Sequence, residues 1–338
     1  MKKIAKLTGA LLLATALTAC SQSGDDGADA AAPACDRACL IDLANDYVAG
    51  LESNDASGVN FAADARIVEN LNRINAGDGL WSDITGAGTD FSVVVPDEAN
   101  QTIGWIGMVE REGEPAVIGL RLALDGDGAI AEAEHLYASV PEDRTAERLT
   151  TPRAGLLTEV AEESRMVHGD LIDLGMTYYP ALDDNDGSLM PFAEDCQRHE
   201  NGMVTAGAEA GAGPNNLTSP IARDCAGQLT ANVMAYITTI DNRRVFAADP
   251  VTGLVMGLSH FRHPMDFEPY EVTALDGSVI MYDVDTLPFQ PFDLPAAHIF
   301  KVGDDGLVHE IEAMGFQAPL NAATGWEEDA PLEEAAAE

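Results

Sequence analysis

The sequence contains very little lysine, and its scarcity of basic residues limits the partners that we expect. Eighteen Lys and Arg residues stand against 57 Asp and Glu residues, which gives a formal net charge of −39 over 338 residues. Three of the four lysines (Lys2, Lys3 and Lys6) lie near the N-terminus, which leaves Lys301 for the rest of the chain. Such a surface repels phosphates, so we expect no nucleic-acid partner. The acidity favours solubility and does not by itself imply a cationic partner.

Long hydrophobic runs are also missing. The apolar run at Leu7–Leu17 is too short to span a bilayer and follows basic residues, as in an export signal. It ends in Leu17-Thr18-Ala19-Cys20, which resembles a bacterial lipobox. We therefore expect residues 1–19 to be a lipoprotein signal peptide and Cys20 to carry a lipid. An ordinary secretory signal that happens to contain a cysteine is the alternative.

The segments beside this signal and at the far end are acidic and rich in small residues. Residues 20–34 are predicted to be a flexible tether and residues 321–338 a disordered tail. Ser21, rather than Asp, follows the lipobox cysteine, and in Gram-negative lipoproteins this favours export to the outer membrane. We expect the protein to lie at the periplasmic face of that membrane, held through its N-terminal lipid only.

Cysteine is scarce too. With Cys20 lipidated, an even number remains in an oxidising compartment, which indicates disulfides; the remaining cysteines are Cys35, Cys39, Cys196 and Cys225. Of the three possible pairings we predict Cys35–Cys39 and Cys196–Cys225, and the second would hold a Gly- and Asn-rich insertion at residues 202–220. A metal site is the alternative, but paired CxxC spacing is absent, so we expect no metal.

Two stretches of the chain repeat each other. FAADARIVEN (61–70) and FAEDCQRHEN (192–201) share Phe, Ala, Asp, Glu and Asn at one offset, 192 − 61 = 131. LALDGDGAIAEAE (122–134) matches FKVGDDGLVHEIE (300–312) without a gap. Collinear matches of this kind indicate an internal duplication. Further matched pairs are Tyr47 and Tyr178, Leu51 and Leu182, Asn54 and Asn185, Ser57 and Ser188, and Asp97 and Asp249.

Each copy shows the same plan of a helix followed by strands. Residues 39–53 have apolar side chains at a period near 3.6, and residues 159–174, with the segment to 182, serve the second copy. Strand-like segments with Pro, Asp, Asn and Gly turns follow in both copies. The sequence predicts an α+β fold of two domains, residues 35–150 and 151–320, each with N-terminal helices on a curved antiparallel sheet.

Several motifs carry a family resemblance: CDRACL, AGDGLW, EDCQRHENG and IDNRRVFAADPVTGLV. With the helix-then-meander plan, the chain resembles the cone-shaped fold of nuclear transport factor 2-like and SnoaL-like proteins. The motifs are similar to an uncharacterised domain family of fungal and bacterial secreted proteins. The resemblance covers most of residues 35–316. It implies two cone-shaped domains and little chemistry, because one fold hosts many functions.

Histidines distinguish the second copy from the first. Five of the seven stand where the first copy has no histidine: His199 for Val68, His260 for Met108, His263 for Arg111, His298 for Leu120 and His309 for Ala131. We expect Lys301 to face water, so alternation along its strand predicts that His298 faces inward. His260 is the second inward candidate, His263 a rim residue and His309 a solvated one. For each, a hydrogen-bonded structural histidine is the alternative.

Other polar residues of the second copy complete a candidate site. Glu200 could act as a base, although its recurrence as Glu69 favours a structural role, and Asn201 recurs likewise as Asn70. An arginine could clamp a carboxylate or enolate, or pair with one of many acids. Tyr179 could donate to a substrate oxygen or merely pack. The predicted ligand-binding residues are Arg198, Arg244, Tyr179 and Asn201.

These residues lead to one expected function and one competing function. We expect the second domain to bind a small, mostly apolar, oxygenated molecule, and to act on it, if it is an enzyme, by cofactor-free isomerisation or a lyase step. The expected catalytic groups are His260, His298 and Glu200. The competing function is a non-catalytic ligand-binding or envelope assembly module. A hollow filled by Phe and Leu side chains would favour the non-catalytic module. The sequence lacks a GxSxG elbow, a phosphate loop and a dinucleotide fingerprint.

Overall fold

The fold was obtained as a computed structural model, which describes residues 35–140, 146–207, 223–287 and 289–332. The predicted signal peptide, Cys20, the tether through residue 34 and most of the predicted insertion at 202–220 lie outside these ranges. The described residues belong to one compact unit, in which two sheets correspond to the two copies of the sequence. We call residues 35–140 the first half and residues 151–320 the second half.

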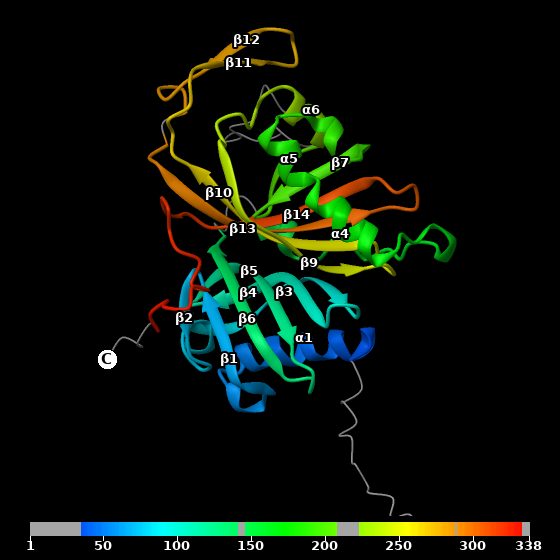
Figure 1. The fold of residues 1–338 in the computed structure, drawn as a ribbon, viewed down its shortest axis with the longest axis vertical. Helices are drawn as coiled ribbons and strands as arrows, with labels where there is room; N and C mark the ends of the chain where they lie inside the picture. The colour runs from blue at the N-terminus through cyan, green and yellow to red at the C-terminus, as the bar shows by residue number, and fades with distance from the viewer. Residues whose placement is uncertain (1–34, 141–145, 208–222, 288, 333–338) are drawn as a thin grey trace, which may run out of the picture. The chain divides into compact units, whose positions relative to one another are not determined.

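The first half contains a six-stranded sheet in the order β2-β1-β6-β5-β4-β3 (Figure 1). Helix α1 (Arg37–Glu52) packs on this sheet through its apolar stripe, which includes Leu40 and Tyr47. The short helix α2 (Leu80–Asp83) and the 3-10 turn η1 (Ala56–Gly58) complete this half. The strands are β1 (Phe61–Glu69), β2 (Asn72–Ile74), β3 (Ile84–Asp97), β4 (Thr102–Arg111), β5 (Glu114–Leu124) and β6 (Ile130–Ser139).

The second half repeats this arrangement in the order β8-β7-β14-β13-β10-β9, with β15 (Ala318–Pro319) added beside β13. Its strands are β7 (Phe192–Glu200), β8 (Met203–Ala206), β9 (Thr239–Asp249), β10 (Leu254–His263), β13 (Phe292–Val302) and β14 (Val308–Gly315). Its helices are α4 (His168–Met176), α5 (Tyr178–Asp183) and α6 (Cys225–Thr230), with 3-10 turns η3 (Glu162–Ser164) and η4 (Gly187–Leu189). The connecting segment carries η2 (Ala146–Leu149) and α3 (Ala154–Leu157).

Both sheets are mixed, so the prediction of antiparallel sheets is wrong for one strand pair in each half. β1 runs parallel to β6, and β7 runs parallel to β14. In each half the first strand is separated from the last by the whole meander, so the two are not joined by a turn and are free to run in the same direction. The coarser prediction, an α+β protein with two sheets, is confirmed.

The sequence match between the copies reappears as matching strand register. Trp105 lies opposite Leu120 in the first sheet, and Gly257 lies opposite His298 in the second. These two pairs are related by the offsets 257 − 105 = 152 and 298 − 120 = 178, which are the offsets of the matched sequence segments. The alignment of His298 with Leu120 therefore describes equivalent places in the two sheets.

Each sheet is covered on both faces. Helices cover one face, and a third core cluster joins the other faces of the two sheets, with Val93 and Ile106 from the first half and Met256 and Ile299 from the second. Strands buried on both faces show continuous rather than alternating burial, as in β4 and β10. The expectation that Lys301 faces water is therefore wrong. Its ammonium group is buried and donates hydrogen bonds to the carbonyl oxygens of Thr158 (2.6 Å) and Thr252.

Contacts between the halves are reciprocal. Arg37, at the start of α1, binds Asp249 of the second half (2.9 Å), and His168, at the start of α4, binds Asp97 of the first half (2.7 Å). Arg37 and His168 are matched residues (168 − 37 = 131), as are Asp97 and Asp249. Equivalent residues also meet each other, since Gly119 lies against Ala297. The halves therefore pack as the protomers of an isologous dimer do.

The second half departs from the predicted plan in two places. Its helical segment is divided at Thr177 into α4 and α5, and Pro180 lies in the first turn of α5, where a missing N–H is tolerated. Between β10 and β13 the chain forms an added hairpin, β11 (Tyr270–Thr273) and β12 (Val279–Tyr282), where the first half has a tight turn. Figure 1 shows this hairpin at one end of the second half.

The predicted disordered tail is ordered over residues 321–332. Trp326 lies against the guanidinium groups of Arg66 and Arg121, and its carbonyl oxygen accepts a hydrogen bond from Arg66 (2.9 Å). Leu332 forms a parallel bridge with Arg73 of β2. An acidic segment stays on the surface here because its single aromatic residue and two of the scarce arginines hold it there. Residues 333–338 lie outside the described residues.

Candidate functional site

His298 lies on the helix-facing side of the second sheet, as predicted. Its strand, β13, places it beside Phe300 in the core that α4 and α5 cover. Three aromatic rings surround the imidazole: Tyr178 at 5.1 Å, Phe261 at 5.5 Å and Phe300 at 6.0 Å between ring centroids. The ring is fully buried. Burial, with a further contribution from the positive charge of Arg198, lowers the pKa of His298 well below its usual value, so the ring is neutral near pH 7.

The imidazole of His298 has no hydrogen-bond partner on either nitrogen. Buried polar groups are nearly always paired, and leaving one unpaired costs about 1–3 kcal/mol. Leu120 fills the equivalent place in the first half and carries no such cost. The position therefore requires an explanation other than packing.

Arg198 and Glu200 lie on the same face of β7 and bind each other rather than standing free. Arg198 donates from Nη2 to Glu200 (2.5 Å), from Nε to the Tyr178 hydroxyl (3.0 Å) and from Nη1 to Thr205 (2.7 Å). Burial alone would lower the pKa of Arg198, but Tyr178 and Glu200 raise it above its ordinary value, so the guanidinium stays charged. Each nitrogen of Arg198 is engaged, which leaves little capacity to clamp a carboxylate in two places.

The first half contains a matching network that the sequence analysis missed. Tyr47 lies 2.8 Å from Nε2 of His135, and Nδ1 of His135 lies 2.9 Å from Glu69. An ionised carboxylate only accepts, so the His135 Nδ1–H donates to Glu69 and the Tyr47 hydroxyl donates to Nε2. The amide of Leu80 also donates to Glu69 (3.1 Å). The recurrence of Tyr and Glu in both copies was the signal available in the sequence.

The two networks have one layout with different central residues. A tyrosine from the covering helix and a glutamate from the first strand are bridged by His135 in the first half and by Arg198 in the second. A cationic or imidazole bridge between the same two groups ties helix to sheet in both halves. This supports the structural alternative for Glu200 and Arg198, which the sequence analysis left open.

His260 does not share a face with His298, so the expectation of one inner wall bearing both is wrong. It follows Met256 and Leu258 on the face of β10 that packs against the first half, and it is opposite Pro295 in the sheet. Its Nδ1 lies 3.4 Å from the side-chain amide of Asn242. Burial, together with the positive charges of Arg262 and Arg244, lowers the pKa of His260 to about 4. Sequence phase could not reveal that both faces of this strand are buried.

The remaining predicted ligand-binding residues have partners within the protein. Arg244 binds Glu134 of the first half through both terminal nitrogens (2.7 and 2.8 Å), a bidentate pair that joins the two sheets. Asn201 exchanges two hydrogen bonds with the backbone of Gly315, as Asn70 does with Tyr137. Tyr179 is fully buried. The structure therefore does not gather these side chains around His298.

Two further histidines differ in their surroundings. His263, predicted to lie at a rim, is buried and stacks on Phe292 at 4.2 Å, and burial lowers its pKa to about 4. His309 is partly exposed, as expected, and lies between Asp195 (2.7 Å) and Asp305 (3.0 Å). These aspartates raise the pKa of His309 against the opposing effect of burial.

A second polar cluster, also missed by the sequence analysis, lies around the buried Glu312 on the face of the second sheet that packs against the first half. Arg153, from the connecting segment, binds Glu310 (2.5 Å) and Glu312 (2.7 Å), and His199 lies opposite Glu312 in the sheet. Burial raises the pKa of Glu312 to about 7, while Arg153 opposes the shift. Glu312 is the equivalent of Glu134 (312 − 134 = 178), but Glu134 binds Arg244 whereas Glu312 binds Arg153.

Both predicted disulfides are confirmed. Cys35 pairs with Cys39 at the start of α1, and Cys196 of β7 pairs with Cys225 at the start of α6. The second bond fixes a helix of the added segment to the sheet. The Cys196 side of this bond corresponds to Ala65 in the first half (196 − 65 = 131), so the first half has no equivalent bond.

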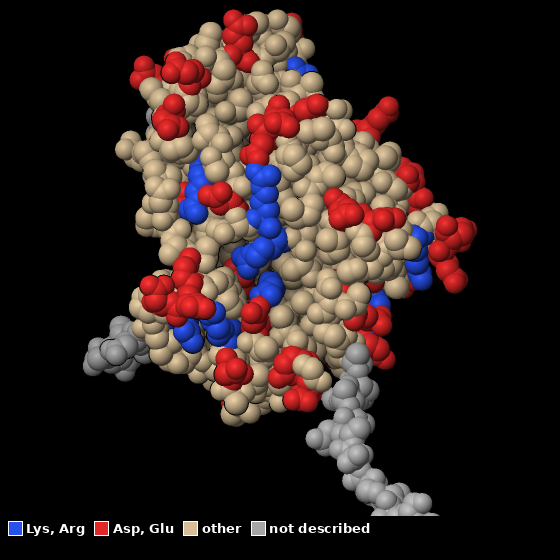
Figure 2. All heavy atoms as spheres, in the orientation of Figure 1, with Lys and Arg blue, Asp and Glu red and all other residues tan. Residues whose placement is uncertain are grey.

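Several arginines at the surface bind acidic side chains, although acidic residues far outnumber basic ones. Figure 2 shows acidic groups spread over the face it presents and a smaller number of basic groups gathered in a strip. Arg111, for example, binds Asp83 and Glu112, each at 2.6 Å. Exposed pairs of this kind contribute little to stability, about 0–1 kcal/mol each.

One comparison with known proteins gives a match. Residues 164–315 match the model of a domain family described as a domain of unknown function, DUF8021. The match covers the second half and omits the first. No curated protein matches the chain.

Proposed function

We propose that the second half binds a small, mostly apolar molecule that carries an oxygen function, and that this oxygen hydrogen bonds to His298. The observation that carries the proposal is the fully buried imidazole with no partner on either nitrogen. A neutral imidazole offers one donor and one acceptor, which suits a hydroxyl or carbonyl group. The rings of Tyr178, Phe261 and Phe300 supply the apolar surroundings that such ligands require.

Binding without catalysis is the form of this function that the geometry favours. The lowered pKa of His298 makes it a weak base near pH 7, and His260 lies on the opposite face of the sheet. A general base works best when its pKa is near the working pH. A cofactor-free isomerase or lyase is therefore the weaker candidate.

We also propose that each half is a cone-shaped domain of the nuclear transport factor 2-like kind. In support, both halves place helices on one face of a mixed sheet with the same strand order, and over the described residues neither sheet closes into a barrel. In such a fold the interior lies between helix and sheet, which is where His298 lies. The repeated strand order also supports origin by internal duplication.

The binding proposal is tested with variants that copy the first half. His298→Leu installs the side chain of Leu120, and His260→Met installs that of Met108 as the matched control on the opposite face. Protein purified from its native envelope is extracted and its small molecules are identified by mass spectrometry. We expect one apolar, oxygen-bearing species to copurify with wild type and with His260→Met, and its amount to fall at least tenfold with His298→Leu. A species retained equally by His298→Leu, or no species at all, would reject the proposal.

We propose in addition that a lipid on Cys20 holds the protein at the envelope. The support is the signal and lipobox pattern of the sequence. Among the described residues there is no helix with the length and apolarity needed to cross a membrane. Cys20→Ser should therefore move the protein from the membrane fraction to the soluble envelope fraction. Unchanged fractionation would contradict the lipid anchor.

A further inference from the structure

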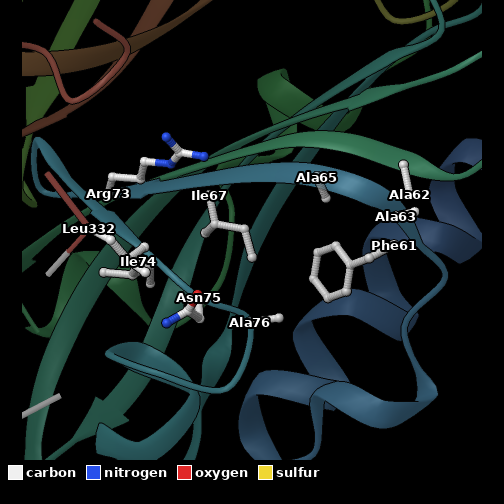
Figure 3. A pocket seen from close by; sticks show the side chains of 10 residues that line it. All are labelled: Phe61, Ala62, Ala63, Ala65, Ile67, Arg73, Ile74, Asn75, Ala76 and Leu332. Carbon is white, nitrogen blue, oxygen red and sulfur yellow. The ribbon is translucent and has the colours of Figure 1, made fainter. Parts of the chain in front are cut away.

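A pocket of about 400 Å³ lies in the first half beside β1 and β2 (Figure 3). Most of its lining residues are apolar and several are small, with Arg73 and Asn75 as the polar ones; the apolar ones include Phe61, Ala63, Ala65, Ile67, Ile74 and Ala76. In Figure 3 the side chains of Ile67 and Ile74 extend to the same side of the strand pair. The volume lies at the lower end of the range for ligand pockets, about 300–1,000 Å³.

The small residues of the pocket lie where β1 leaves its neighbouring strand. Phe61 is paired with Ile130, and pairing resumes only at Arg66 with Glu132, so the alanines between them are bulged out of the sheet. The same irregularity recurs in β7, between Phe192 and Gln197. The two halves therefore have the same groove beside their first strand.

In the second half this groove is filled by helix α6. Cys196, the equivalent of Ala65, is bonded to Cys225 at the start of α6. Gln228 of α6 donates to the carbonyl oxygen of Thr205 (2.9 Å) on β8, the strand that corresponds to β2. Gly207, at the end of that strand, donates to the carbonyl oxygen of Arg223, just before α6 (2.9 Å). Each contact involves a position whose counterpart lines the pocket of the first half.

We infer that the pocket of the first half is a docking groove for a short helix of a partner protein. The second half shows the kind of segment that fits. The buried residues of α6 are Cys225, Gln228 and Leu229, at positions i, i+3 and i+4 of one helical face. The partner helix therefore presents a small residue and, four residues later, a leucine, with a polar amide beside the leucine.

The pocket favours this occupant over an anionic one. Most of its lining residues are apolar, and the chain as a whole carries a net charge of −39. Two lining residues are polar, Arg73 and Asn75, and Figure 3 shows the guanidinium of Arg73 on the other side of the strand pair from Ile67 and Ile74. An acidic ligand would lose its hydration and approach a negative protein. A helix with an uncharged inner face avoids both costs. Leu332, the last described residue of the chain, also lines the pocket, so the C-terminal segment is the competing occupant that the experiment must separate.

Disulfide capture tests the groove in the full chain. Ala65→Cys, made with Cys20→Ser, places a thiol at the position of Cys196. The probe is a synthetic peptide of this chain, Asp224–Met234, whose Cys225 forms the bond in the second half. Ser92→Cys, an exposed position on the opposite edge strand of the same sheet, is the matched control. In a buffer of reduced and oxidised mercaptoethanol, we expect the Ala65→Cys protein to capture at least tenfold more peptide than the control.

Further arms decide between the possible occupants. A peptide carrying Leu229→Ala should lose the preference; equal capture of both peptides would overturn helix recognition. Removal of residues 333–338 should change capture less than twofold, and a tenfold rise would show that the C-terminal segment, not a partner, occupies the groove.

Should Ala65→Cys fail to fold, fluorescence polarisation of a labelled peptide with Cys225→Ala on the wild-type chain replaces it. Ala63→Trp, which narrows the groove, should then weaken binding at least fivefold, and unchanged binding would overturn the inference.

Discussion

Nε2 of His168 lies 2.7 Å from Oδ2 of Asp97, across the boundary between the two halves. The matched residues Arg37 and Asp249 form the reciprocal pair on the other side. The buried Asp97 carboxylate also accepts hydrogen bonds from the amides of Asn100 (2.8 Å) and Ala248 (3.0 Å). Two aspartates at equivalent positions thus join the halves, and each is bound by the first residue of a helix in the other half.

The aspartates of this interface should be important for stability. Asp97→Ala removes the acceptor of the buried Ala248 amide, and Asp249→Ala removes the acceptor of the partly exposed Arg37, so we expect each to lower the free energy of unfolding by about 1–3 kcal/mol. Asp83→Ala, which removes the partly exposed partner of Arg111, should cost no more than about 1 kcal/mol. Urea unfolding of the three variants measures these changes. Equal losses of unfolding free energy at positions 83 and 97 would show that the pairs across the interface stabilise the protein no more than a partly exposed pair does.

Glu312 should make the stability of the protein depend on pH. Its pKa rises from 4.5 to about 7 on folding because burial disfavours the charged carboxylate. The folded protein therefore binds more protons than the unfolded chain between these values. The contribution of this group is complete below about pH 4.5 and is lost as the pH rises towards 7, with a slope of at most about 1.4 kcal/mol per pH unit.

Glu312→Gln replaces the titrating carboxyl group with an amide of nearly the same shape, which does not titrate in this pH range. The variant should gain stability relative to wild type as the pH rises from 4.5 to 7, and the difference should level off above that range. Chemical unfolding at half-unit pH steps measures the difference. If the curves of variant and wild type run parallel, Glu312 does not titrate in this range.

The two disulfides should differ in their contribution to stability. Chain entropy predicts about 2 kcal/mol for closing the four-residue separation of Cys35–Cys39 and about 3.5 kcal/mol for the 29-residue separation of Cys196–Cys225. Paired Cys→Ala variants measure both by thermal unfolding. Loss of the Cys196–Cys225 bond should also increase protease cleavage around α6, because this bond holds that helix to β7. A larger loss from the shorter bond would contradict the entropic account.

The internal repeat of the sequence predicted which strand positions are equivalent in the two halves. The later matched segments gave the offsets 152 and 178, and the pairing of β4 with β5 and of β10 with β13 reproduces both offsets residue by residue. The cysteine count in an oxidising compartment predicted both disulfides, and alternation along the strand predicted the inward position of His298. These features depend on local pattern and chain spacing, which the sequence contains directly.

Reasoning about faces failed where long-range packing decided the environment. Lys301 and His260 lie on the strand face that alternation gives them, but that face is buried: Met256 packs against the first half, and the Lys301 ammonium binds carbonyl oxygens of Thr158 and Thr252. Alternation tells which residues lie together and does not tell whether the other side meets water or a second sheet. For Arg244, predicted to bind a ligand or else to pair with an acid, the structure shows a pair with Glu134 of the other half.

The sequence by itself determined the α+β class, the repeated strands, the cysteine pairs and the histidine in place of Leu120, because each follows from residue types at fixed spacing. Only the tertiary structure decided which polar groups have partners. His135 reaches Glu69 across 66 residues, Arg153 reaches Glu312 across 159, and His298 reaches none. Hydrogen bonds depend on distances of about 3 Å that arise only when remote strands pack together, so pairing cannot be read from order along the chain.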